Sequence, residues 1–149
     1  MITIKNASQL AKMRSAGHLL YDVLCALREK IVPGITTKDI DAWAAELIRR
    51  AGAIPSFLNY QGFPACVCTS VDSQVVHGIP SADVRLNEGS ILSVDCGLIL
   101  DGWQADSAFT VPLGKVSEEV LQLIAVTEQC FFAGAAQALH GGRMGDIGQ

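Results

Sequence analysis

Two aspartates, Asp95 and Asp106, interrupt the most strand-like segment of the sequence, "SVDCGLILDGWQADSAFT" at residues 93–110. Runs of Val, Leu and Ile flank an Asp-Gly pair, which is typical of a β-hairpin closed by a two-residue turn. Acidic residues are depleted in strands, so these two carboxylates require an explanation. Counting back from the turn places Asp106 opposite Gly97 and Asp95 opposite Ala108. Because side chains alternate along a strand, both aspartates should point to one face, as diagonal neighbours with Cβ atoms about 7 Å apart or less.

The two faces of this hairpin differ in polarity. The face of the aspartates is mostly small or polar, whereas the opposite face is core material: Leu92, Val94, Cys96, Leu98, Trp103 and Phe109. Two anionic carboxylates this close repel each other, so they share a proton, bind a bridging cation or stay solvated on an open sheet face. Divalent ions about 3.5–4 Å apart can be spanned by carboxylates from neighbouring strands, and this interpretation fits a same-face pair best.

His77, in "SQVVHGIPSAD", is a third candidate for chemistry. Gly78 and Pro80 place it at the end of a strand, where functional residues often lie. Because histidine titrates near neutrality, it could donate a proton or a hydrogen bond in a reaction. A loop or core histidine with a backbone partner is the alternative.

Two helices and a group of strands must position these residues. Apolar residues at helical spacing predict a first helix from an N-cap at Ser8 to about Lys30, and a second helix capped by Thr37 and stopped by Gly52. Between residues 53 and 112, Pro, Gly, Asn and Asp separate short β-prone runs, which predict antiparallel strands.

A third helix should begin near Ser117, continue towards Leu139 and end at two glycines. The order of helices, strands and helix predicts an α+β fold, in which helices cover an antiparallel sheet.

Composition narrows the function classes. The formal net charge of −4 argues against nucleic acid or an anionic membrane as partner. The sequence has no apolar run long enough to span a membrane and no signal-peptide pattern, which predicts a cytoplasmic protein. Five cysteines without a CxxC pair argue against a disulfide framework or a zinc finger and favour small, reduced side chains.

Three segments, "KMRSAGHLL", "GFPACVCTSVDSQVVHGIP" and "LNEGSILSVDCGLILDGWQADSAFTVPLG", together resemble type I methionine aminopeptidases. The match runs along nearly the whole chain in the family's order and spacing. The resemblance implies one half of a pita-bread fold, as in creatinase-like metallopeptidases. It also implies removal of the initiator methionine from the N-terminus of nascent polypeptides.

The resemblance gives roles to particular residues. Asp95 and Asp106 correspond to ligands of two divalent metal ions (Co, Mn, Fe, Zn or Ni), and Asp106 bridges both. His77 corresponds to a residue that contacts the substrate and assists the reaction, and the residues that align with the methionine pocket are Tyr60, Phe63 and Cys68. One departure concerns Gly97, which stands where many members carry a small hydroxyl residue near the metals.

The family's remaining ligands, one histidine and two glutamates, belong to a C-terminal half. Residues 1–149 are therefore expected to be the N-terminal portion of the catalytic domain, with the C-terminal half absent and little activity alone. In keeping with this, Asp146 has the character of an N-cap, yet only Ile147, Gly148 and Gln149 follow it. The alternatives are a non-catalytic, shortened paralogue that acts as a binding or self-assembling module through exposed surface, and a prolidase-like peptidase.

Overall fold

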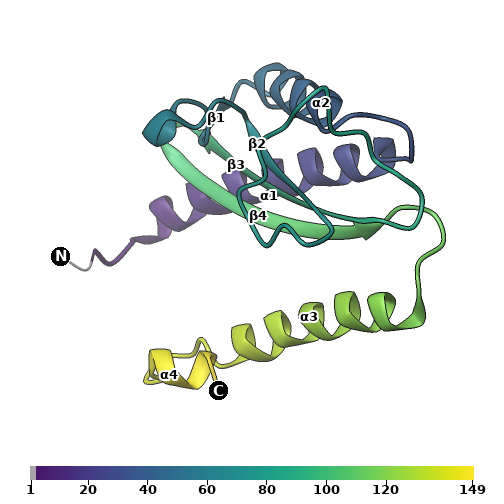
Figure 1. Cartoon of the computed structure of the whole chain (residues 1–149). Helices are drawn as coiled ribbons and strands as arrows, with labels where there is room; N and C mark the ends of the chain where they lie inside the picture. Colours follow the sequence, from purple (N-terminus) through teal and green to yellow (C-terminus); the bar gives the residue numbers. More distant parts are fainter. Residues whose placement is uncertain (1–2) are drawn as a thin grey trace. The chain divides into compact units, whose positions relative to one another are not determined.

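Helices and an antiparallel sheet confirm the predicted α+β class (Figure 1). The computed structural model describes residues 3–149, which divide into one unit ending at Lys115 and a second unit, Val116–Gln149. The first unit contains α1 (Ala7–Lys30), α2 (Thr37–Arg50) and four strands: β1 (Ile54–Pro55), β2 (Val67–Val71), β3 (Ile91–Leu100) and β4 (Trp103–Pro112). All strand pairs are antiparallel, and β3 is central: β4 lies along one of its edges, and β1 and β2 pair with it as well.

The β3–β4 hairpin has the predicted turn and register. Asp101 and Gly102 adopt left-handed φ angles of +49° and +81°, as a two-residue hairpin turn of type I′ requires. Leu100 pairs with Trp103 directly before and after the turn. A slip of one residue would exchange the two faces of the sheet, so this turn decides which side chains enter the core.

The core lies on the face of the sheet that α1 and α2 cover. Ala16, Leu20 and Leu27 of α1 and Ile40, Ala44 and Ile48 of α2 are buried together with Leu92, Val94, Cys96 and Leu98 of β3. Trp103 and Phe109 of β4 pack at its margin, partly buried. The apolar face predicted from the sequence is therefore the core face. In the first unit α1 and α2 both pack on this one side, and a short 3-10 helix, η1 (Tyr60–Gly62), completes the unit.

Both helices begin one or two residues earlier than predicted. The N-cap of α1 is Asn6 rather than Ser8, because Asn6 and Gln9 exchange side-chain-to-backbone hydrogen bonds of 2.9 and 3.0 Å. The N-cap of α2 is Thr36 rather than Thr37, because Thr36 and Asp39 form the same reciprocal capping box. The hydrogen bonds from Thr36 also lower the pKa of the Asp39 carboxyl.

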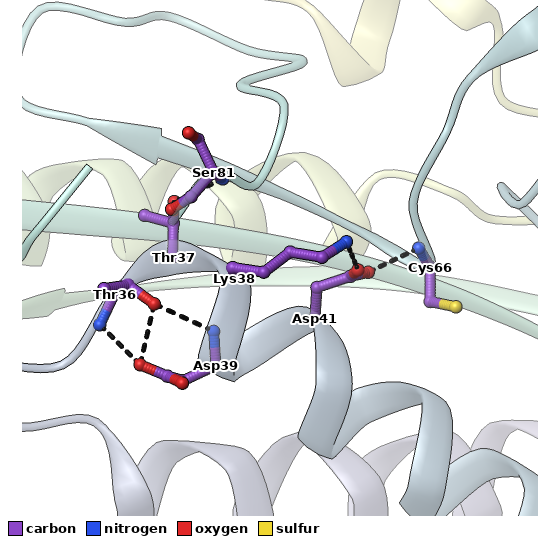
Figure 2. A network of polar contacts seen from close by, with 7 residues as sticks. All are labelled: Thr36, Thr37, Lys38, Asp39, Asp41, Cys66 and Ser81. Carbon is purple, nitrogen blue, oxygen red and sulfur yellow. Dashed lines mark hydrogen bonds and ion pairs between the residues drawn. The ribbon is translucent and has the colours of Figure 1, made fainter. Parts of the chain in front are cut away.

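Polar side chains at the start of α2 hold two distant segments of the first unit (Figure 2). The Thr37 hydroxyl donates to the carbonyl of Ser81 at 3.1 Å and accepts from the Ser81 N–H at 2.9 Å. The nearly buried carboxylate of Asp41 accepts the Cys66 N–H at 2.7 Å and an ion-pair hydrogen bond from Lys38 at 2.8 Å. These contacts fix the entry into β2 and the loop that follows His77.

The second unit consists of α3 (Glu118–Ala136) and the single turn α4 (Met144–Ile147). Ser117 caps α3 as predicted, but the helix ends at Ala136 instead of continuing towards Leu139. Asp146 is not an N-cap: it lies inside α4, and its carboxylate accepts the Arg143 N–H at 2.7 Å. Across the described residues, we find no helix with the length and apolar character needed to cross a membrane.

Replacing Asp41 by alanine should lower the free energy of unfolding by about 2 kcal/mol, because the buried Cys66 N–H loses its acceptor. Urea denaturation followed by circular dichroism measures the change. Lys38→Ala is the matched control, since it removes only a half-exposed ion-pair partner and should cost less than about 1 kcal/mol. Equal losses in the two variants would contradict the assigned role of Asp41.

Candidate metal centre

The predicted positions of Asp95 and Asp106 are confirmed by the register of the hairpin. Asp95 pairs with Ala108 and Asp106 with Gly97, so the two carboxylates are diagonal neighbours on the face opposite the core. Asp95 is half-buried and Asp106 is exposed. Neighbouring positions on this face are small or polar, and the hydroxyls of Ser93 and Thr110 form a 2.8 Å hydrogen bond.

The two carboxylates interact strongly. Burial, the charge of Asp106 and a hydrogen bond with that carboxyl raise the pKa of Asp95 from 3.8 to about 6, and the nearby His77 partly offsets this rise. Two carboxylates that hold a proton near pH 6 repel each other when both are ionised. A bound divalent cation relieves this repulsion just as a proton does. The chemistry of the pair therefore fits an oxygen-ligated divalent metal ion.

Cys68 lies next to this pair rather than apart from it. It is the cross-strand partner of Asp95 on β2. Burial and the charges of Asp95 and Asp106 raise the pKa of its thiol to about 11, so the sulfur stays protonated at neutral pH. In the metal-free chain the carboxylates are therefore the anionic groups of this face.

Two carboxylates are an incomplete ligand set. Among residues 3–149, no group of three or more His, Cys, Asp and Glu side chains is arranged to hold a metal ion. Glu118, Glu119 and Glu128 lie on α3 in the second unit and belong to no such group within residues 3–149. Two aspartates fit part of a metal site and leave further coordination positions to other ligands.

His77 is held in a backbone conformation that is uncommon for a non-glycine residue, with φ of +59°. Its neighbour Gly78 packs directly on β2: the Thr69 N–H donates to the Gly78 carbonyl at 2.8 Å, and the Gly78 N–H donates to the Ser70 hydroxyl at 3.1 Å. A Cβ at Gly78 would lie 2.2 Å from the Thr69 carbonyl oxygen, so only glycine fits there. This docking presents the exposed His77 side chain near Asp95.

A cavity of about 530 Å³ brings His77 together with the predicted pocket residues Tyr60 and Phe63. The other lining residues are Phe57, Gln61, Gly62, Pro64 and Ile79. Phe57 and Phe63 meet edge to face, with ring centroids 6.5 Å apart and planes at 84°. Cys68, predicted with this pocket, is not among these lining residues and pairs with Asp95 across the strands. His77 thus belongs to both the apolar cavity and the surroundings of Asp95.

Phe57 and Ile79 are site residues that the sequence reasoning missed. The signal for Phe57 is the dense aromatic stretch "SFLNYQGF" at residues 56–63, and Ile79 follows His77 by two positions. A further cavity of about 590 Å³ lies in the second unit and is lined by Cys130, Asp146 and residues near them. It holds no paired carboxylates in the described chain, so it lacks the chemistry of the first.

Comparison with known proteins agrees with this geometry. The model of metallopeptidase family M24 matches residues 11–149. Methionine aminopeptidase of Clostridium acetobutylicum is 48% identical over 147 residues, covering 99% of this chain and 59% of that protein. The crystal structure of methionine aminopeptidase from Rickettsia prowazekii has a TM-score of 0.88 at 36% identity and covers 90% of this chain and 54% of that chain.

The chain spans less than two thirds of the length of these relatives. A prolidase from Pyrococcus furiosus shares the fold alone, with a TM-score of 0.72 at 15% identity over 88% of this chain and 37% of that chain. Together these matches confirm the resemblance drawn from the sequence and the expected half of a pita-bread fold.

Asp95→Asn should stabilise the metal-free chain at pH 7.5. The folded-state pKa of Asp95, about 6, exceeds its ordinary value of 3.8, so the native protein loses stability as the pH rises from about 4 through 6. A shift of two pKa units corresponds to ~3 kcal/mol without solvent screening. Because Asp95 is only half-buried, removing its charge should raise the free energy of unfolding by less than this, roughly 1–2 kcal/mol.

Thermal unfolding in EDTA at pH 7.5 and pH 4.5 measures this gain. The gain should shrink at pH 4.5, where Asp95 is already protonated in the native state. A loss of stability at pH 7.5 would contradict the repulsion assigned to the pair.

Proposed function

The chain belongs to metallopeptidase family M24, and we propose that residues 1–149 carry the N-terminal portion of the catalytic domain of a metal-dependent methionine aminopeptidase. The proposed reaction removes the initiator methionine from nascent polypeptides, which puts the activity in the cytoplasm. The observation that carries the proposal is the joint position of His77, which lines an apolar cavity and also lies near enough to Asp95, the partner of Asp106, to lower the pKa of Asp95.

Asp95 and Asp106 would hold the divalent ions, with a transition metal such as Co, Mn, Fe, Zn or Ni as the occupant. When bound, such ions lower the pKa of water and polarise a peptide carbonyl, which is the chemistry that amide hydrolysis needs. The residues of this chain have separate tasks. The aspartates supply anionic oxygens from a rigid hairpin, and His77 is at hand to donate a hydrogen bond to the reacting amide.

The cavity supports methionine as the residue that is removed. Its volume of about 530 Å³ has room for a long side chain, and its wall of Phe57, Tyr60 and Phe63 suits an apolar one. A thioether makes favourable contacts with aromatic rings. The high identity to methionine aminopeptidases, against a likeness of fold alone to prolidase, favours this substrate class over proline-containing dipeptides.

A fusion protein tests the proposal. Residues 1–149 are joined to the part of the Clostridium acetobutylicum methionine aminopeptidase that follows its matched region, which supplies the remaining length of the relative. We expect release of methionine from a Met-Ala-Ser peptide with Mn²⁺ or Co²⁺, and loss of turnover in EDTA. Asp106→Asn should lower kcat/KM by more than about 100-fold, since even outer-shell partners of a metal are worth 10–100-fold.

Asp101→Asn is the matched control for that fusion. It removes the same charge from the same hairpin, but at the exposed turn, where asparagine also suits the left-handed backbone. Its kcat/KM should stay within about twofold of the unmodified fusion, as expected for a surface substitution. Equal activity of the Asp106 variant, or cleavage of a Met-Pro dipeptide in place of Met-Ala-Ser, would refute the proposal.

The 149-residue chain by itself should show little or no turnover of Met-Ala-Ser, even with added cobalt or manganese. The described residues offer two carboxylates and no third metal-binding side chain beside them, so water would fill most coordination positions. Methionine release measured by liquid chromatography checks this. Robust turnover that Asp106→Ala abolishes would show instead that two ligands suffice.

A further inference from the structure

A row of three residues crosses the aspartate face at the level of Asp106. Gly97 on β3 is the cross-strand partner of Asp106 on β4. On the other edge of β3, Ser56 directly follows β1 and donates its N–H to the Gly97 carbonyl at 3.0 Å. Ser56, Gly97 and Asp106 therefore lie side by side, with the glycine in the middle.

The hydroxyl of Ser56 occupies the space that a side chain at position 97 would fill. A Cβ built on Gly97 would lie 2.2 Å from Ser56 Oγ and 2.8 Å from a ring carbon of Phe57. The Gly97 carbonyl points to Ser56 and away from β4, so Gly97 and Asp106 form a non-hydrogen-bonded pair of the antiparallel ladder. In such a pair the two Cβ positions are about 4.5–5.5 Å apart. The Ser56 hydroxyl thus lies within reach of the Asp106 carboxylate.

Ser56 Oγ is a buried polar atom, and no described residue forms a hydrogen bond with it. A buried hydroxyl without a partner costs about 1–3 kcal/mol. The other such atom in the described chain, Thr69 Oγ1, belongs to a residue paired with Val94 and lies towards the core. Ser56 Oγ differs from it because it lies on the aspartate face, where only Gly97, which has no side chain, separates it from Asp106.

We propose that Ser56 is a positioning residue of the metal centre, whose hydroxyl donates a hydrogen bond to the Asp106 carboxylate when that carboxylate holds a divalent ion. The inference rests on the proposed function, because it concerns the same centre. Metal-ligating carboxylates are themselves commonly hydrogen-bonded, and this second contact fixes their orientation. Ser56 donates from the position directly after β1, and Gly97 is needed because any side chain there would displace the hydroxyl.

Mn²⁺ binding to the 149-residue chain, measured by electron paramagnetic resonance of the free ion, tests the assignment. Ser56→Ala should weaken binding about tenfold, at the lower end of the range for outer-shell partners. Ser56→Thr keeps the hydroxyl and should bind within about threefold of the unmodified chain, while Asp106→Ala should abolish binding. The visible absorption spectrum of bound Co²⁺ should change in Ser56→Ala, which a purely structural role of the hydroxyl would not cause.

A transplanted hydroxyl separates hydrogen bonding from packing. In the Ser56→Ala background, Gly97→Ser places a hydroxyl in the vacated space, and Gly97→Ala places only a methyl group there. Both double variants displace Phe57 to the same extent. With serine at position 97, the Mn²⁺ affinity should recover to within about threefold of that of the unmodified chain. With alanine there, it should stay about tenfold weaker than that of the unmodified chain.

Three results would overturn the inference. One is Mn²⁺ binding by the unmodified chain that Ser56→Ala leaves unchanged, and this result leaves the proposed function standing. A second is equal affinity of the two double variants when circular dichroism shows that both are folded, which points to packing alone. The third is absence of Mn²⁺ binding by the unmodified chain, which counts against the inference, while the fusion protein decides separately whether the proposed function stands.

Discussion

Strand register is the constraint on which the rest of this structure depends. The β3–β4 hairpin buries Leu92 and Val94 under two helices and sends Asp95 and Asp106 to the other side. A slip of one residue would reverse both assignments at once, so the apolar core holds the site in place as firmly as the turn does. The same alternation aligns Cys68 with Asp95 and Gly97 with Asp106. The same strand pairing therefore determines both which residues form the core and which form the candidate site.

The aspartate face works against the stability that the core provides. Like charges close together on a partly buried surface raise the pKa of Asp95, which means that the ionised pair destabilises the native state. The first unit tolerates this because its apolar material is gathered on the opposite face. The polar contacts of Asp41 and Thr37 add independent restraint where β2 begins and where the loop after His77 returns to α2. Functional sites are commonly places where local stability is given up in this way.

The sequence predicts those features that follow from short-range patterns. The Asp-Gly turn, the alternation of the hairpin and the periodic faces of α1 and α2 are all local, and the hairpin register follows from them by counting. Helix starts are less predictable, because several cap-forming residues stand together and reciprocal hydrogen bonds select Asn6 and Thr36 from among them. β1 is not predictable: it has two residues, and one is Pro55, a residue type rare within sheets. The contact between Ser56 and Gly97 depends on β1 and is hidden for that reason, as is the pairing of Cys68 with Asp95 across β2 and β3.

The empty side-chain position at Gly97 has a consequence for how such sites diverge. A chemical group near a metal is defined by its coordinates, and two adjacent strands can each deliver an oxygen to the same point in space. A mutation to glycine on one strand and to serine on its neighbour would then exchange the donor while preserving the arrangement. Comparison of aligned columns would record a lost hydroxyl at one place and an unrelated polar residue at another. Such a pair would evolve as one unit, and the three-dimensional neighbourhood would show the exchange that the columns conceal.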